Sequence, residues 1–131
     1  MDIEELYALL NMERRTKSLQ RFPEKEIKQY LSRLRAIQRK LLMSEEEWKR
    51  RRRVEEELEM AENYVRDIIK FRARKVANCA IFASLVSMSP LVSCTKDMTD
   101  GEREIFLNLC EHLRMIYKKL VSEEVQKNDK H

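Results

Sequence analysis

Apolar residues recur along the chain at intervals of three and four positions, which is the spacing of one face of an α-helix. Four such runs occur, over about residues 2–15, over 23–41, from 44 onward and from 99 onward. The runs predict four helices, and no segment alternates in the manner of a β-strand. We therefore expect an all-α fold, a four-helix bundle whose third helix is long. The side chains predicted to face inward on the fourth helix are Ile105, Phe106, Leu109, Leu113, Ile116, Tyr117 and Leu120.

Helix-capping signals support these boundaries. The segments Asp2–Glu5, Ser44–Glu47 and Thr99–Glu102 each have the spacing of a capping box, in which a short polar side chain and an acid three residues later satisfy backbone N–H groups. Pro23 suits the first turn of the second helix, where its missing N–H costs nothing. Only one Gly and two Pro are present, so few residues would interrupt the helices.

The third helix raises a question of size. About forty residues would extend about 60 Å, which is longer than a compact four-helix domain of this size needs. Either part of the helix projects and serves as an assembly surface, or the helix breaks near Arg50. Pro90 must end it, unless the serines at 84, 87 and 89 end it sooner. We expect one helical domain over residues 1–125, followed by a polar tail or the start of a linker at 126–131.

The segment from Val76 to Cys94 runs for nineteen residues without a charge, in a chain that is 38% charged. Its length meets the requirement for a membrane span. Asn78, four serines and Pro90 argue against one, and we expect no membrane association. The segment is therefore predicted to be a helix end and a loop that are buried in the core or at a subunit interface.

A basic run, Lys49, Arg50, Arg51, Arg52 and Arg53, follows the start of the third helix. Glutamates precede and follow it at the i,i+4 spacing of helical ion pairs, which contribute a few tenths of a kcal/mol each. Two interpretations remain open: a solvated helix face that pairs with itself, or a contact with DNA or protein.

A second basic group contains Arg72, Arg74 and Lys75. No carboxylate lies between Asp67 and Asp97, so this group needs acids from another helix, acids from another subunit, or phosphates. A structural ion pair and a ligand contact both fit this pattern.

Composition adds few constraints. The net charge of +4 permits nucleic-acid contact without demanding it. The acidic start is unlike a signal peptide. Cys79, Cys94 and Cys110 are odd in number and lack a CxxC pair, which argues against a disulfide framework and a zinc site and favours a reducing, cytoplasmic location. His112 has no partner for nucleophilic catalysis, and no Gly-rich phosphate loop exists. We expect no enzyme activity, no metal and no cofactor.

Three segments in order resemble the archaeal GINS replication factors, in particular the subunit type whose helical domain comes first. They are Leu6–Pro23 with its leucine–tyrosine pair, Ala61–Val76 with its basic segment, and Met98–Phe106 with its capped helix start. The likeness covers about residues 6–120. The family type usually adds a small β-rich domain, which does not follow here, so the chain is expected to be a helical-domain fragment or a form that lacks that domain.

The resemblance implies a non-enzymatic scaffold in DNA replication, located in the cytoplasm at the nucleoid. GINS subunits form tetramers of one or two kinds, and the two remain open here. The complex joins the MCM helicase and a RecJ-like partner, and connects to primase and polymerase. The alternative is a helical nucleic-acid-binding protein that acts through its basic segments. The positions expected to meet partner subunits are Tyr64, Ile68, Arg72, Arg74, Lys75, Val76, Ile81, Phe82, Leu85, Val86 and Leu91.

Overall fold

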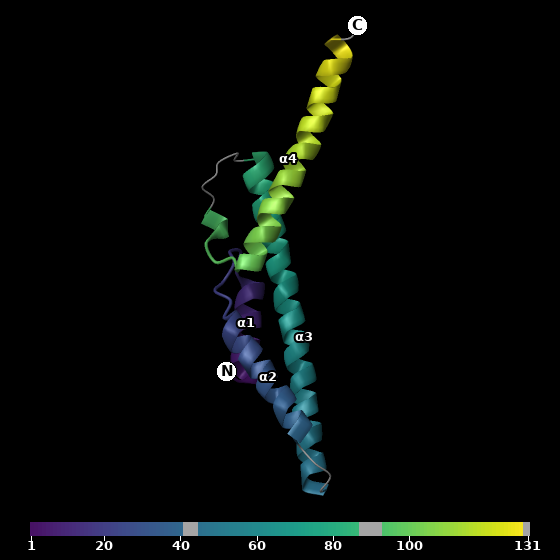
Figure 1. Ribbon diagram of the computed structural model, residues 1–131. Coiled ribbons are helices and arrows are strands. Elements are labelled where there is room, and N and C mark those ends of the chain that lie inside the picture. The colour runs from purple at the N-terminus through teal and green to yellow at the C-terminus, as the bar shows by residue number, and fades with distance from the viewer. Residues whose placement is uncertain (41–44, 87–92, 130–131) are drawn as a thin grey trace. The chain divides into compact units, whose positions relative to one another are not determined.

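The computed structural model describes residues 1–40, 45–86 and 93–129, and its side chains through residue 122. Four α-helices account for most of this part: α1 (Ile3–Arg15), α2 (Glu24–Lys40), α3 (Glu45–Ile81) and α4 (Asp100–Asp129) (Figure 1). A π-helical turn, η1 (Phe82–Val86), continues α3, and a short 3₁₀ turn, η2 (Ser93–Thr95), precedes α4. The described residues contain no strand. The all-α prediction with one long helix is confirmed.

The helix boundaries follow the predicted signals closely. The Asp2 carboxylate accepts a hydrogen bond from the Glu5 backbone N–H at 2.8 Å, as a cap for α1 should. At the start of α4, the Thr99 hydroxyl accepts from the Glu102 N–H at 3.2 Å. In return the Glu102 carboxylate accepts from the Thr99 N–H at 2.9 Å, which completes a reciprocal capping box. The third predicted box depends on Ser44, which lies outside the described residues, as do Leu41, Pro90 and Leu91.

The third helix does not break near Arg50, because α3 runs without interruption from Glu45 to Ile81. The chain stays helical through Ser84, but it widens to π geometry at Phe82. At the other end of the chain, α4 reaches Asp129 and so includes part of the stretch expected to be a polar tail.

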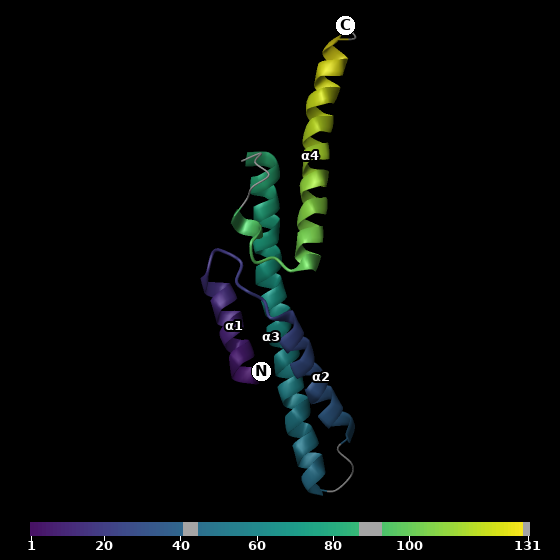
Figure 2. The same ribbon diagram turned by 60° about the vertical axis from the view of Figure 1, so that its left-hand side comes forward.

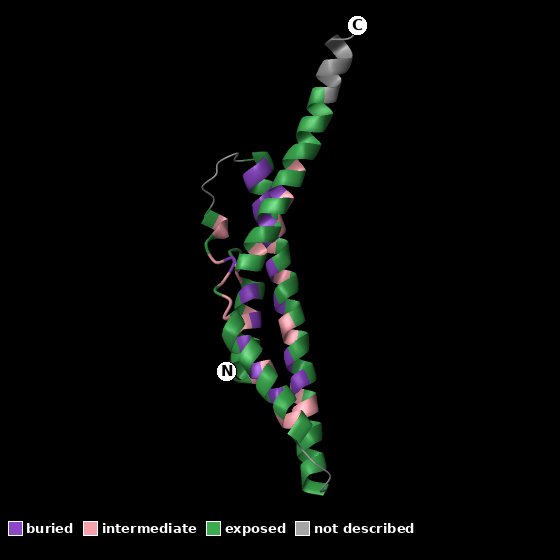
Figure 3. Ribbon diagram, viewed as in Figure 1, coloured by how far each residue is buried: buried purple, intermediate pink, exposed green. Residues whose placement is uncertain are grey.

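Within the single helical domain expected from the sequence, the chain divides into two compact units, residues 1–72 and residues 73–131. In the first unit, α2 runs antiparallel to α1 and to its part of α3 (Figures 1 and 2). The stripes predicted from spacing meet in its core, where burial appears along the facing sides of the helices (Figure 3). The core consists of Leu6, Leu10, Ile27, Tyr30, Leu34, Leu58, Ala61 and Ile68.

In the second unit, α4 packs against η1, and its Cys110 also touches Ala80 at the end of α3. Small side chains line this contact: Ala80 is fully buried, and Ala83 and Ser84 are almost so. Such residues let helix backbones approach closely. The other buried members of this unit are Val76, Cys79, Met98, Phe106 and Cys110.

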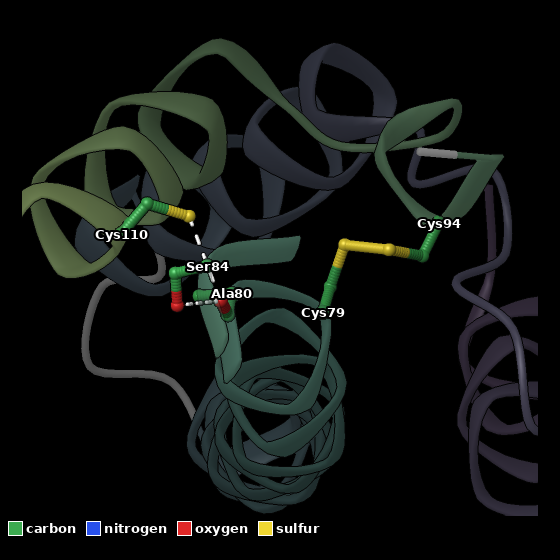
Figure 4. The surroundings of a disulfide bond; sticks show 5 residues. All are labelled: Cys79, Ala80, Ser84, Cys94 and Cys110. Atoms are coloured by element: carbon green, nitrogen blue, oxygen red, sulfur yellow. Dashed lines mark hydrogen bonds between the residues drawn. A yellow bond between two sulfur atoms is a disulfide. The ribbon is translucent and has the colours of Figure 1, made fainter. Parts of the chain in front are cut away.

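The structure corrects the prediction about cysteines. Cys79 in α3 and Cys94 in η2 form a disulfide, with their Cα atoms 5.9 Å apart (Figure 4). The odd number of cysteines and the absence of a CxxC pair did not exclude this bond, because the chain returns along α3 before α4 begins. In the loop-entropy account, closing a loop of this length stabilises the fold by about 3 kcal/mol. Cys110 remains a buried free thiol.

Candidate assembly interface

The most buried ion pair in the described part of the chain joins α1 to α3. Arg72 Nη1 donates to Glu13 Oε1 at 2.7 Å, and the two side chains are 1% and 2% exposed. The same nitrogen donates to the backbone carbonyl of Gln20 at 2.5 Å. The Gln20 N–H in turn donates to Glu13 Oε2 at 3.2 Å, and the guanidinium lies 4.9 Å from the centre of the Phe22 ring. Arg72 therefore holds both α1 and the connector between α1 and α2 against α3.

This cluster decides between the alternatives left open for the second basic group. The acid that Arg72 requires comes from another helix of the same unit, so the guanidinium is an internal structural group. Its predicted place at a partner interface is wrong, because the side chain is buried within its own unit. Ile68 and Val76 were also expected to meet partners, and both are buried in the cores of their units instead. Arg74 and Lys75 both interact with other groups of the protein.

Glu13 was not predicted as the partner of Arg72. A signal was present: Leu6, Leu10 and Glu13 occupy positions i, i+4 and i+7 of α1, and all three are buried. An acid on the apolar stripe of a helix must be paired, because burial of an unpaired carboxylate is too costly. That acid complements the basic group of α3, which has no carboxylate close after it in the sequence.

Other residues expected at an interface do lie at the surface. Ile81, Phe82, Leu85 and Val86, from the end of α3 and η1, are 44% to 66% exposed. Val76, Ala80 and Ala83 occupy the opposite side of the same helix end and are buried. In its described helical part, residues 76–86, the uncharged segment is therefore apolar on both sides, and the described residues of the chain cover only one of them. Tyr64 is half-buried, with its ring centre 5.3 Å from that of Tyr7.

The helix α4 carries the larger uncovered surface. Phe106 and Cys110 are buried, and Leu113, one turn further, is half-buried. The same stripe continues through Tyr117 and Leu120, which are 57% and 64% exposed.

Five further apolar side chains of α4 are exposed as well, namely Ile105, Leu107, Met115, Ile116 and Val121. The prediction that Ile105, Ile116, Tyr117 and Leu120 face a core within the chain is wrong. Ile105 is exposed beside buried Phe106, and the other three lie beyond Cys110, the last position of α4 that is buried among the described residues.

The basic run on α3 is partly neutralised along the helix, as its spacing predicts. Arg51 pairs with Glu55 at 3.1 Å and Arg52 with Glu56 at 3.5 Å, and each of these side chains is about half or more exposed. Lys49, Arg50 and Arg53 are exposed on the same helix. Exposed pairs of this kind contribute little to stability. The run is a solvated helix face with both charge signs interspersed.

The thiol of Cys110 faces the end of α3, where its sulfur lies 3.7 Å from the carbonyl oxygen of Ala80. The Ser84 hydroxyl donates to the same oxygen at 2.6 Å. Burial raises the pKa of the Cys110 thiol, and the charge of Arg114 lowers it by less. The thiol is therefore protonated and unreactive near neutral pH.

The described residues bring together no three His, Cys, Asp or Glu side chains in a group that would hold a metal ion. Among the described helices, none combines the length and the apolar character that crossing a membrane requires.

Comparison of the chain with protein-family models, with curated proteins and with solved structures gives no match.

Proposed function

We propose that this chain is a non-enzymatic subunit of a GINS-type complex, which scaffolds the replicative MCM helicase and its accessory factors during DNA replication. One observation carries the assembly part of this proposal: the apolar stripe of α4 passes from buried Phe106 and Cys110 to exposed Tyr117 and Leu120. An apolar surface that continues a core is typical of a protein whose core is completed by a partner.

The exposed side of η1 also supports assembly with a partner. Phe82 and Leu85 are aromatic and aliphatic side chains of the kind that anchor protein interfaces, and they lie about half exposed on a short helical segment. Together with α4 they give the second unit two apolar surfaces. The partners follow from the resemblance: other GINS subunits of the same or a second kind, the MCM helicase, a RecJ-like protein, and primase or polymerase.

A nucleoid-associated cytoplasmic location belongs to the same proposal. The Cys79–Cys94 disulfide restricts this location. In a reducing cytoplasm such a bond is usually transient, and it persists as a structural bond in the intracellular proteins of hyperthermophiles.

The rival function is direct nucleic-acid binding through Lys49, Arg50, Arg51, Arg52 and Arg53. The ion pairs of Arg51 and Arg52 weigh against it, because those cations are already partly compensated. Salt separates the two functions. Binding that neutralises several phosphates weakens steeply as salt rises, whereas apolar assembly survives high salt.

The test is size-exclusion chromatography with light scattering, at low and at high salt. We expect an oligomer in both conditions, and a shift toward monomer in Leu120→Glu. The matched control is Asn108→Glu, which adds the same charge at an exposed polar position of α4 and should leave the oligomer intact.

A wild-type chain that is monomeric at tens of micromolar, alone and with a candidate partner subunit, would contradict assembly. Pull-down with purified MCM helicase tests the replication part separately. An oligomer that ignores the helicase would leave an assembly protein of another kind.

A further inference from the structure

The Cys79–Cys94 disulfide ties η2 to one side of the α3 end, while α4 covers the other side through Cys110 and Ala80 (Figure 4). Val76, Ala80 and Ala83 make up the buried side of this helix end. The segment that leads into α4 is therefore fixed covalently at Cys94 and by packing at Met98.

We propose that this bond is a reducible clasp, a site of thiol–disulfide exchange that controls how firmly the start of α4 is held on α3. That reduction of this bond loosens the start of α4 is independent of the proposed function. That reduction weakens assembly rests on the proposed function.

The two sulfurs differ in accessibility, and this difference decides which sulfur a reductant attacks first. Cys94 is half-buried in a short surface turn, whereas Cys79 is 4% exposed within α3. A thiolate of a dithiol reductant attacks the Cys94 sulfur, the S–S bond breaks, and Cys79 leaves as a thiolate that takes up a proton. The second thiol of the reductant then attacks the mixed disulfide and releases Cys94 as a thiol. Two electrons pass from the dithiol, which becomes a disulfide.

Cys110 is not the resolving thiol in this scheme. Its sulfur faces the Ala80 carbonyl, on the side of α3 away from the Cys79–Cys94 bond (Figure 4). Burial also keeps it protonated. The exchange therefore depends on an external dithiol. After it, the Cys79 thiol stays in α3, and the Cys94 thiol lies on a segment that only noncovalent packing retains.

Loss of the clasp changes the presentation of the apolar surfaces. Phe82 and Leu85 belong to η1, which continues α3, and Leu120 belongs to α4. A partner that contacts both surfaces therefore requires the two elements in a fixed relation. Reduction frees the segment before α4, and assembly through the two surfaces together weakens.

The experiment compares the oxidised chain with the chain treated with dithiothreitol, under conditions where alkylation and mass measurement confirm each state. We expect the unfolding temperature to fall by about 10 °C on reduction. We also expect faster hydrogen exchange in the first turns of α4. The variant Cys79→Ala/Cys94→Ala should match the reduced chain and ignore the reductant, and Cys110→Ala should retain the full response. Equal unfolding temperatures and equal exchange in the two states would overturn the clasp.

Oligomer size in the same samples keeps the two proposals apart. An oligomer that loosens on reduction supports both. A chain that is monomeric in both states, yet loses stability on reduction, supports the clasp and contradicts assembly. An oligomer whose size and stability ignore reduction contradicts the clasp alone.

Discussion

Glu13 and Arg72, 59 positions apart in the sequence, form an ion pair of 2.7 Å from which solvent is almost completely excluded. Removing the negative charge of Glu13 leaves the Arg72 cation buried without the carboxylate that lies 2.7 Å from it. We expect Glu13→Gln to lower the free energy of unfolding by about 3–5 kcal/mol, measured by urea denaturation.

The double variant Glu13→Leu/Arg72→Met should recover much of that loss, because a buried ion pair can often be replaced by apolar residues of similar volume. Glu56→Gln, in an exposed pair with Arg52, is the matched control and should change stability by less than about 0.5 kcal/mol. If Glu13→Gln were as mild as this control, the buried pair would not stabilise the first unit.

The capping box at the start of α4 gives a prediction of smaller size. Thr99→Ala removes the hydroxyl that accepts from the Glu102 N–H, and should cost about 1 kcal/mol in thermal unfolding. Thr99→Ser keeps the hydroxyl and should retain most of that stability. Equal losses in the two variants would assign the effect to the threonine methyl group instead of the cap.

Alkaline pH should destabilise the first unit through Tyr30. Burial of the phenol, and then the nearby Glu57 carboxylate, raise its pKa well above the ordinary value of 10.0. The unfolded chain therefore releases this proton at lower pH than the folded chain does. Stability is fully present below about pH 10 and falls as the pH rises above it.

Urea denaturation between pH 8 and pH 11 measures this slope, and Tyr30→Phe should flatten it while keeping the ring in the core. Tyr117, which is exposed, supplies the control: Tyr117→Phe should leave the slope unchanged. A slope that persists in Tyr30→Phe would assign the loss to other groups.

A new charge in η1 should disrupt either assembly or folding, depending on whether the position is exposed or buried. Phe82→Glu and Leu85→Glu alter exposed side chains, so the monomer should fold normally by circular dichroism while its oligomer dissociates. Ala83→Glu places the same charge at a position that is 2% exposed, and should destabilise the second unit itself. Unaltered oligomers in the first two variants would show that this surface takes no part in assembly.

Local patterns in the sequence predict the helices well, because spacing and caps are properties of a few neighbouring residues. Asp2, Thr99 and Glu102 make the bonds that their spacing predicts. The apolar stripes of α1, α2 and the first part of α3 likewise predict the core of the first unit.

Pairings between distant residues were not predictable in the same way. The bond between Cys79 and Cys94 depends on η2 lying beside α3, and the partner of Arg72 depends on which helix lies beside it. The exposure of Leu120 depends on where the covering elements end, since a stripe looks the same whether the chain or a partner covers it. The ion pairs of the basic run on α3 could be predicted from the sequence, because their i,i+4 partners lie on the same helix.

Ala61 and Ala80, one in each unit, have no exposed surface at all. Each lies at a place on α3 that neighbouring side chains cover completely, and in a close-packed interior a larger side chain there is expected to force the surrounding elements apart. In related sequences we therefore expect these two positions to accept only alanine, glycine or serine, while the charged residues around them vary freely. Such a pattern would identify relatives by their small residues even where the helix surfaces have lost every other likeness.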